Sequence, residues 1–237
     1  MDLIKSLPPI EIQKKQWERT GILSIPNLLN DKADETHRYY FNKPNKEWNL
    51  MVYPKIDVDL GAGTLSHVCN LTDPDLQDQL LHIHQLRNKD QFTYNYERLD
   101  NSIEENYLHP SIREIFFSQE FLDYLSAITS YEDLTIRDLD CFMSRYSSGH
   151  YNGPHTDGDN GRLAFVYHLS KFWRTEYGGL FCRLDWNFKP ETVVSPPFDD
   201  LLIFDTKYQG KQGSPHLVTE VAQHSDNKRI SFTGWFQ

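Results

Sequence analysis

Two histidines and one aspartate in the second half of the sequence could bind one metal ion. His155 and Asp157 are two residues apart and come directly after Gly153 and Pro154. Residues two apart on a strand project from the same face, so this imidazole and carboxylate can converge on a single ion. His216 is the best candidate for a third ligand. Two histidines and a carboxylate leave adjacent coordination positions open, an arrangement that suits a redox-active ion such as iron(II).

A basic residue near the carboxy terminus could bind a carboxylate. Residues 229–236 (RISFTGWF) alternate, so that Arg229, Ser231 and Thr233 face one way along a strand. A guanidinium beside a hydroxyl suits a carboxylate, because the guanidinium fork makes two parallel hydrogen bonds. An arginine in a surface salt bridge is the alternative reading.

The segment between His216 and Arg229 predicts how the two are related. Residues 223–228 are polar, which favours a hairpin that sets Arg229 opposite Glu220. Glu220 lies four residues along from His216, about 13 Å on a strand. A five-carbon diacid that chelates the metal could bridge that gap to the arginine.

Short β-type runs, separated by turn residues, make up the chain from residue 134 onward. About eight such strands without crossover helices predict a double-stranded β-helix, the jelly-roll or cupin-like core. The predicted strands are residues 135–147, 150–157, 162–169, 179–184, 191–195, 200–205, 214–221 and 229–236.

The first half of the chain contains both helix-like and strand-like sequence patterns. Helices are predicted at residues 10–19, in the thirties, and at 74–87, 110–117 and 119–129, with strands at 22–29 and 92–99. We therefore expect a mainly β (α+β) fold in which amino-terminal helices buttress the jelly roll. One domain spans residues 1–237: helical support and lid elements at 1–133, and the catalytic core at 134–237.

Composition narrows the class of protein. The formal net charge of −10 argues against broad attraction to nucleic acid or anionic lipid. The three cysteines are an odd number without Cys-x-x-Cys spacing, so neither a disulfide framework nor a thiolate metal site is expected. No signal peptide and no membrane-spanning segment is evident, which favours a cytoplasmic protein with no membrane or nucleic-acid partner. Oligomeric state is not readable from the sequence.

These motifs together resemble prolyl-4-hydroxylase-like 2-oxoglutarate oxygenases. The resemblance covers roughly residues 134–237 in the expected order, whereas the helical first half is only loosely similar. It is carried by residues 146–157 (YSSGHYNGPHTD), residues 162–170 (RLAFVYHLS), Trp173, the pair Gly178 and Gly179, residues 201–204, residues 214–216 and residues 229–236.

The resemblance implies a set of roles. It assigns iron(II) to His155, Asp157 and His216, and the distal carboxylate of the cosubstrate 2-oxoglutarate to Arg229. Tyr146 matches a tyrosine that lines the cosubstrate pocket. Oxygen is the further reactant, and ascorbate is a candidate reductant. The carboxylate of Asp157 argues against the related halogenases, which lack this ligand.

One departure from the family concerns the cosubstrate pocket. Where many relatives carry a tyrosine that helps to hold the distal carboxylate, this sequence has His168, beside Tyr167. With Ser231, either residue could contact 2-oxoglutarate. A histidine buried in the barrel for structural reasons is an equal alternative.

The implied activity is hydroxylation of an unactivated C–H bond, with release of succinate and CO2. The substrate is an amino-acid-like small molecule, or a prolyl or other residue in a protein. Candidate substrate residues are Arg162, which could instead pair with Asp159, and Tyr94, Tyr96 and Arg98. Trp48, Tyr53 and residues 61–70 could form a lid.

Two other classes of protein remain open. One is a non-catalytic jelly-roll binding protein, although it would have no need for all four of His155, Asp157, His216 and Arg229. The other is a zinc hydrolase that uses the same two histidines and aspartate, which gives Arg229 no role.

Overall fold

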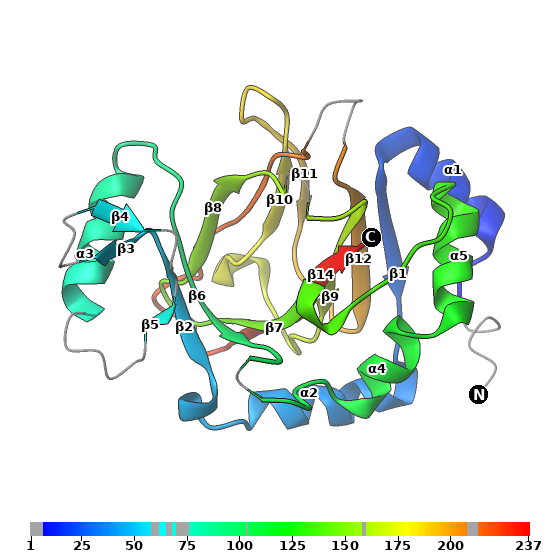
Figure 1. The fold of residues 1–237 in the computed structure, drawn as a ribbon, viewed down its shortest axis with the longest axis horizontal. Coiled ribbons are helices and arrows are strands. Elements are labelled where there is room, and N and C mark those ends of the chain that lie inside the picture. Colours follow the sequence, from blue (N-terminus) through cyan, green and yellow to red (C-terminus); the bar gives the residue numbers. More distant parts are fainter. Residues whose placement is uncertain are drawn as a thin grey trace.

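A curled, mostly antiparallel sheet forms the centre of the molecule, with helices around it (Figure 1). The computed structural model describes residues 7–57, 62–64, 68–69, 76–102, 104–157, 160–207 and 213–237. The helices are α1 (Ile10–Thr20), α2 (Ala33–Phe41), α3 (Leu76–Arg87), α4 (Pro110–Phe116) and α5 (Gln119–Thr129), with short 3-10 turns η2 (Asn30–Lys32), η3 (Asn45–Glu47), η4 (Asp138–Asp140) and η5 (Thr175–Tyr177). No helix in these ranges is both long and apolar enough to cross a membrane.

The strands fall into an amino-terminal group and a carboxy-terminal group. The first group is β1 (Ile22–Pro26), β2 (Asn49–Tyr53), β3 (Lys55–Asp57), β4 (Ala62–Thr64), β5 (Val68–Cys69) and β6 (Tyr94–Leu99). The second is β7 (Cys141–Tyr146), β8 (Tyr151–His155), β9 (Leu163–His168), β10 (Phe181–Leu184), β11 (Pro190–Val194), β12 (Asp200–Asp205), β13 (His216–Val218) and β14 (Arg229–Phe236).

Two walls of strands face each other across a cavity. One wall has the order β1-β12-β9-β14-β7, and the other has the order β8-β13-β10-β11. Strand β6 joins them, because it pairs with β7 near one of its ends and with β8 near the other. This is the predicted double-stranded β-helix, and the prediction of a mainly β jelly-roll core with amino-terminal helices is confirmed.

The helices α1, α2, α4 and α5 cover the outer face of the first wall (Figure 1). Alternation along β14 explains the packing. Ile230, Phe232 and Phe236 are fully buried in one apolar cluster with residues of these helices. The rings of Phe232 and Phe116 lie 4.9 Å apart in an edge-to-face contact. The alternate residues of β14, Arg229, Ser231, Thr233 and Trp235, therefore lie on the cavity side of the strand.

Most of the predicted helices and strands are confirmed. Predicted and observed bounds agree best where a residue such as a helix cap marks the end of an element. Helix α5 begins after Ser118, whose hydroxyl accepts a hydrogen bond from the backbone N–H of Phe121 at 3.2 Å, as a helix cap does. The strands β2 to β5 were not predicted. The predicted lid at residues 61–70 lies outside the described residues, apart from the short strands β4 and β5.

The predicted hairpin between the last two strands is wrong. Strand β13 pairs with β8 and β10, whereas β14 pairs with β7 and β9. Arg229 consequently lies opposite Tyr146, not opposite Glu220. The polar residues 223–228 connect one wall to the other instead of turning back on the same wall.

Candidate metal centre and active-site cavity

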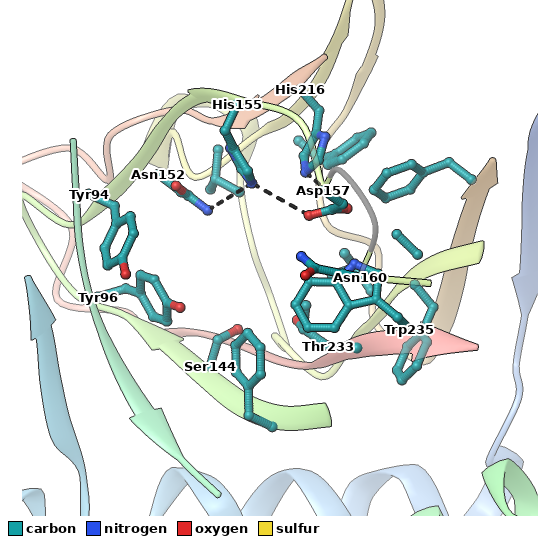
Figure 2. A pocket seen from close by; sticks show the side chains of 18 of the residues that line it. Tyr94, Tyr96, Ser144, Asn152, His155, Asp157, Asn160, His216, Thr233 and Trp235 are labelled. Atoms are coloured by element: carbon teal, nitrogen blue, oxygen red, sulfur yellow. Dashed lines mark hydrogen bonds and ion pairs between the residues drawn. The ribbon is translucent and has the colours of Figure 1, made fainter. Parts of the chain in front are cut away.

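Strand pairing brings His155, Asp157 and His216 together. His155 ends β8 and His216 begins β13, and the two are direct partners in the antiparallel ladder. Asp157 follows two residues after His155, and one ligand atom from each residue lies within 4.8 Å of the others. Asp157 Oδ1 is 3.9 Å from His155 Nε2, and its Oδ2 is 3.7 Å from His216 Nε2 (Figure 2).

Backbone contacts select the ring nitrogens that face Asp157. The Nδ1 atom of His155 is 2.8 Å from the carbonyl oxygen of Gly153, and that of His216 is 2.7 Å from the carbonyl oxygen of Ser214. If each Nδ1–H donates to its carbonyl, each Nε2 lone pair is left free for a metal. Burial, followed by the charge of His216, lowers the pKa of His155 to about 4, so this ring is neutral at pH 7.

Aromatic side chains hold both imidazoles in place. The ring of Phe92 stacks on His155 with centroids 5.3 Å apart, and Phe204 meets His216 edge-on at 4.9 Å. These contacts restrict ring rotation and keep the site poor in water. Two imidazoles and one carboxylate, preoriented in this way, are a donor set that fits iron(II).

A buried cation lies in the same cavity, at the start of β14. Arg229 is 1% exposed and lies over the ring of Tyr146, 5.0 Å from its centroid. Its Nη1 atom donates to Ser231 Oγ at 3.3 Å, and Ser231 Oγ is 2.8 Å from Ser144 Oγ. Its Nε and Nη2 atoms have no partner among the described residues.

His168 lies beside this cation. It pairs with Ser231 between β9 and β14, is fully buried, and neither ring nitrogen has a partner among the described residues. Burial, with a further contribution from Arg229, places its pKa well below the usual value, so the imidazole is neutral. Tyr167 points the other way, into the core, where its hydroxyl donates to Asp199 Oδ1 at 2.7 Å. The structure therefore places His168, and not Tyr167, next to Arg229.

A glycine makes room for the Arg229 side chain. Gly179 has a φ of 61°, and a Cβ atom there would lie 3.0 Å from Cδ of Arg229. A positive φ and this close approach both favour glycine. The same Cβ would lie 3.1 Å from the ring of Trp173, so the position is crowded on two sides.

One cavity of about 340 Å³ connects the metal ligands to Arg229. Three of the residues predicted to bind substrate, Tyr94, Tyr96 and Arg98, line it. Arg162 does not: it is exposed, and its Nη1 donates to the carbonyl oxygen of Glu132 at 2.6 Å. The alternative partner of Arg162, Asp159, lies outside the described residues.

Several lining residues were missed by the sequence reasoning. Figure 2 shows Asn152, Asn160, Thr233 and Trp235 around the cavity. Trp235 could have been found, because it continues the alternation that places Arg229, Ser231 and Thr233 on one face. The Nδ2 atom of Asn152 is 3.5 Å from His155 Nε2. No comparable sequence signal marks Asn152 or Asn160.

Comparison with known proteins finds a matching family model for the second part of the chain. Residues 141–237 match the model of the 2OG-Fe(II) oxygenase superfamily. No curated protein matches the chain. The matched region contains the whole His/Asp/His cluster and Arg229, so this site is similar to that of the superfamily. The similarity favours the oxygenase over the zinc hydrolase and the non-catalytic protein.

Solved structures share the fold over nearly the whole chain. An oxidoreductase of the 2OG-Fe(II) oxygenase family from Burkholderia pseudomallei superimposes with a TM-score of 0.59 at 12% identity, covering 97% of this chain and 91% of that one. A prolyl-4-hydroxylase from Pseudomonas putida gives 0.53 at 15% identity, covering 97% and 93%. A prolyl hydroxylase from Trichoplax adhaerens, in complex with a hypoxia inducible factor peptide fragment, gives 0.50 at 14% identity, covering 96% and 88%.

Proposed function

We propose that this enzyme holds iron(II) with His155, Asp157 and His216 and binds the distal carboxylate of 2-oxoglutarate with Arg229. With O2 it hydroxylates an unactivated C–H bond of an amino-acid-like small molecule, or of a prolyl or other residue in a protein, and releases succinate and CO2. The observation that carries the proposal is the buried guanidinium of Arg229, which lines the same cavity as the metal ligands. Its Nε and Nη2 atoms, and both ring nitrogens of the neighbouring His168, have no partner among the described residues.

Unpaired buried donors are costly, so this end of the cavity favours an acceptor. Leaving a buried polar group without a partner costs about 1–3 kcal/mol, and more for a charged group. A carboxylate between Arg229 and His168 would accept from the guanidinium and from one imidazole N–H. Ser231 orients the guanidinium through its hydrogen bond with Nη1, and Tyr146 packs beneath it.

The protein's part at the metal end is to hold and shield its ligands. Bound iron(II), with 2-oxoglutarate as the electron donor, supplies the oxygen-activating chemistry, and ascorbate is the reductant that we expect to keep the iron ferrous. His155, Asp157 and His216 would hold the ion, and three protein ligands would leave coordination positions for the cosubstrate. Phe92 and Phe204 restrain the two imidazoles and exclude water.

The test is an anaerobic titration of metal-free protein with iron(II) and then with 2-oxoglutarate. We expect a weak visible charge-transfer band that needs both additions. Asp157→Ala should abolish the band, and Arg229→Ala should require roughly 10- to 100-fold more 2-oxoglutarate, since a charged hydrogen bond is worth about 1.5–3 kcal/mol.

The matched control is Arg113→Ala. Arg113 pairs with Asp138 at 2.8 Å and lies over the Phe117 ring, but it does not line the cavity. This variant should titrate like the wild type. Folded wild-type protein that binds iron but gives no band with 2-oxoglutarate would refute the proposed function.

A further inference from the structure

A second arginine lines the cavity that holds the metal ligands. Arg98 lies on β6, on the same face as Tyr94 and Tyr96, and all three line this cavity. Figure 2 shows Tyr94 and Tyr96 on the side of the cavity that faces Trp235 and Asn160. Arg229 is assigned to the cosubstrate in the proposed function, whereas Arg98 has no assigned partner outside the protein.

Neighbouring side chains anchor Arg98 by one edge. Its Nε atom donates to Asp100 Oδ2 at 2.5 Å. The other oxygen of Asp100 accepts from the backbone N–H and the hydroxyl of Ser102 at 2.9 and 2.5 Å, which fixes the carboxylate. The guanidinium carbon lies 4.1 Å from the ring centroid of Phe142.

This anchoring leaves part of the guanidinium for a ligand. A guanidinium has five N–H donors in a planar fork, and the contact with Asp100 does not use all of them. The contacts with Asp100 and Phe142 hold the plane in one orientation, so binding costs little side-chain entropy. The side chain of Arg98 is 26% exposed, so it is accessible from the cavity.

An unpaired donor lies on the neighbouring surface. The indole Nε1 of Trp235 is buried and has no partner among the described residues. Its ring is 6.2 Å from that of Phe142, over which Arg98 lies. Arg98 and Trp235 therefore contact the same ring on the lining of one cavity, and the indole is a second N–H donor that lacks an acceptor among the described residues.

The charge of the site favours a monoanion. Asp100 already neutralises Arg98, so a dianionic phosphate would meet too little positive charge, whereas a planar carboxylate matches the guanidinium fork. The aromatic rings of Tyr94, Tyr96 and Phe142 supply an apolar wall beside it.

We propose that Arg98 binds a carboxylate of the substrate, with Trp235 Nε1 as a second donor, and that the substrate is accordingly a carboxylic acid such as a free amino acid. This inference rests on the proposed function, because it places the substrate in the cavity of the metal ligands. A carboxylate could also come from an acidic side chain in a peptide, and the experiment separates these two sources.

The experiment uses matched pairs of probes with the iron(II)- and 2-oxoglutarate-loaded enzyme. One arm compares free L-proline, L-leucine, L-phenylalanine, L-glutamine and L-lysine with their carboxamides. The other arm compares capped tripeptides centred on aspartate or glutamate with those centred on asparagine or glutamine. Succinate release and perturbation of the anaerobic charge-transfer band are measured for wild type, Arg98→Gln, Arg98→Lys and the control Arg113→Gln.

We expect the acids to stimulate succinate release and perturb the band, and their amides not to do so. Arg98→Gln should weaken this response roughly 10- to 100-fold, with Arg98→Lys intermediate and Arg113→Gln unchanged. The arm that responds identifies the source of the carboxylate. The band itself should form in Arg98→Gln at the same 2-oxoglutarate concentration, which shows that the variant is folded and that the proposed function holds.

Three results would overturn the inference and leave the proposed function intact. The first is that acids and amides stimulate succinate release and perturb the band equally. The second is a preference for acids that persists in Arg98→Gln, and the third is a normal charge-transfer band that no probe perturbs. Loss of the band in wild-type enzyme would instead remove the proposed function.

Discussion

At the scale of single residues, His168 is the side chain whose environment is hardest to explain without a ligand. It is a fully buried neutral imidazole beside a cation, and neither of its nitrogens has a partner in the part of the chain that the structure describes. If it donates to the cosubstrate, His168→Phe should raise the dissociation constant for 2-oxoglutarate roughly 10- to 100-fold, the value of a hydrogen bond to a charged group. His168→Gln keeps an N–H donor and should lose less. Anaerobic titration of the charge-transfer band measures both.

The adjacent tyrosine provides the control for this prediction. Tyr167→Phe removes the hydrogen bond to Asp199 on the core side of the same strand. We expect a lower free energy of unfolding, by about 1–3 kcal/mol, because a buried carboxylate loses a donor. Its affinity for 2-oxoglutarate should not change. If wild type and His168→Phe bind 2-oxoglutarate with equal affinity, His168 does not contact the cosubstrate and has only a structural role in the barrel.

At the scale of elements, the turn before β10 controls how Arg229 enters the cavity. Gly179→Ala would put a methyl group 3.0 Å from Cδ of Arg229 at a φ of 61°. Left-handed backbone costs a non-glycine residue about 1–2 kcal/mol, and the guanidinium must also shift. We therefore expect both reduced stability and weaker binding of 2-oxoglutarate, measured by chemical denaturation and by titration.

Gly149 offers a matched control at another turn. It has a φ of 82°, but an added Cβ would meet only the end of the flexible Gln223 side chain, at 3.1 Å. Gly149→Ala should therefore cost similar stability without affecting 2-oxoglutarate binding. If Gly149→Ala and Gly179→Ala weaken 2-oxoglutarate binding equally, backbone strain explains the effect of Gly179→Ala, and displacement of Arg229 does not.

Local patterns predicted the elements, but not how the strands pair. The alternation in residues 229–236 indicated both the strand β14 and the face that carries Arg229. The hairpin prediction failed because pairing of β14 with β7 and β9 joins residues more than 60 positions apart, which no local polar turn reveals. The clustering of His155, Asp157 and His216 was nevertheless predicted, because the two-residue spacing puts His155 and Asp157 on one face and the family resemblance singles out His216. Asn152 and Asn160 were not, since asparagine has no comparable chemical signature.

At the scale of the whole molecule, one fully buried histidine and three partly buried histidines link stability to pH. Burial is the largest cause that lowers the pKa of His37, His109, His150 and His168, so the folded protein resists protonating them. An unfolded chain protonates each near pH 6.5. As the pH falls below about 6.5, the unfolded state therefore takes up protons that the folded state does not, and the free energy of unfolding decreases.

His168 allows this linkage to be isolated in the metal-free protein. A single group that is protonated only when unfolded contributes up to about 1.4 kcal/mol per pH unit. His168→Gln removes that contribution, so its free energy of unfolding should fall less steeply than that of the wild type between pH 6.5 and 5. Urea denaturation at half-unit intervals, with chelator present, compares the two slopes. Since His155 and His216 are the same in both proteins, their protonation cancels in the difference. Parallel slopes would mean that the imidazole of His168 gains a proton in the folded state, in which case it could not act as the neutral partner of Arg229.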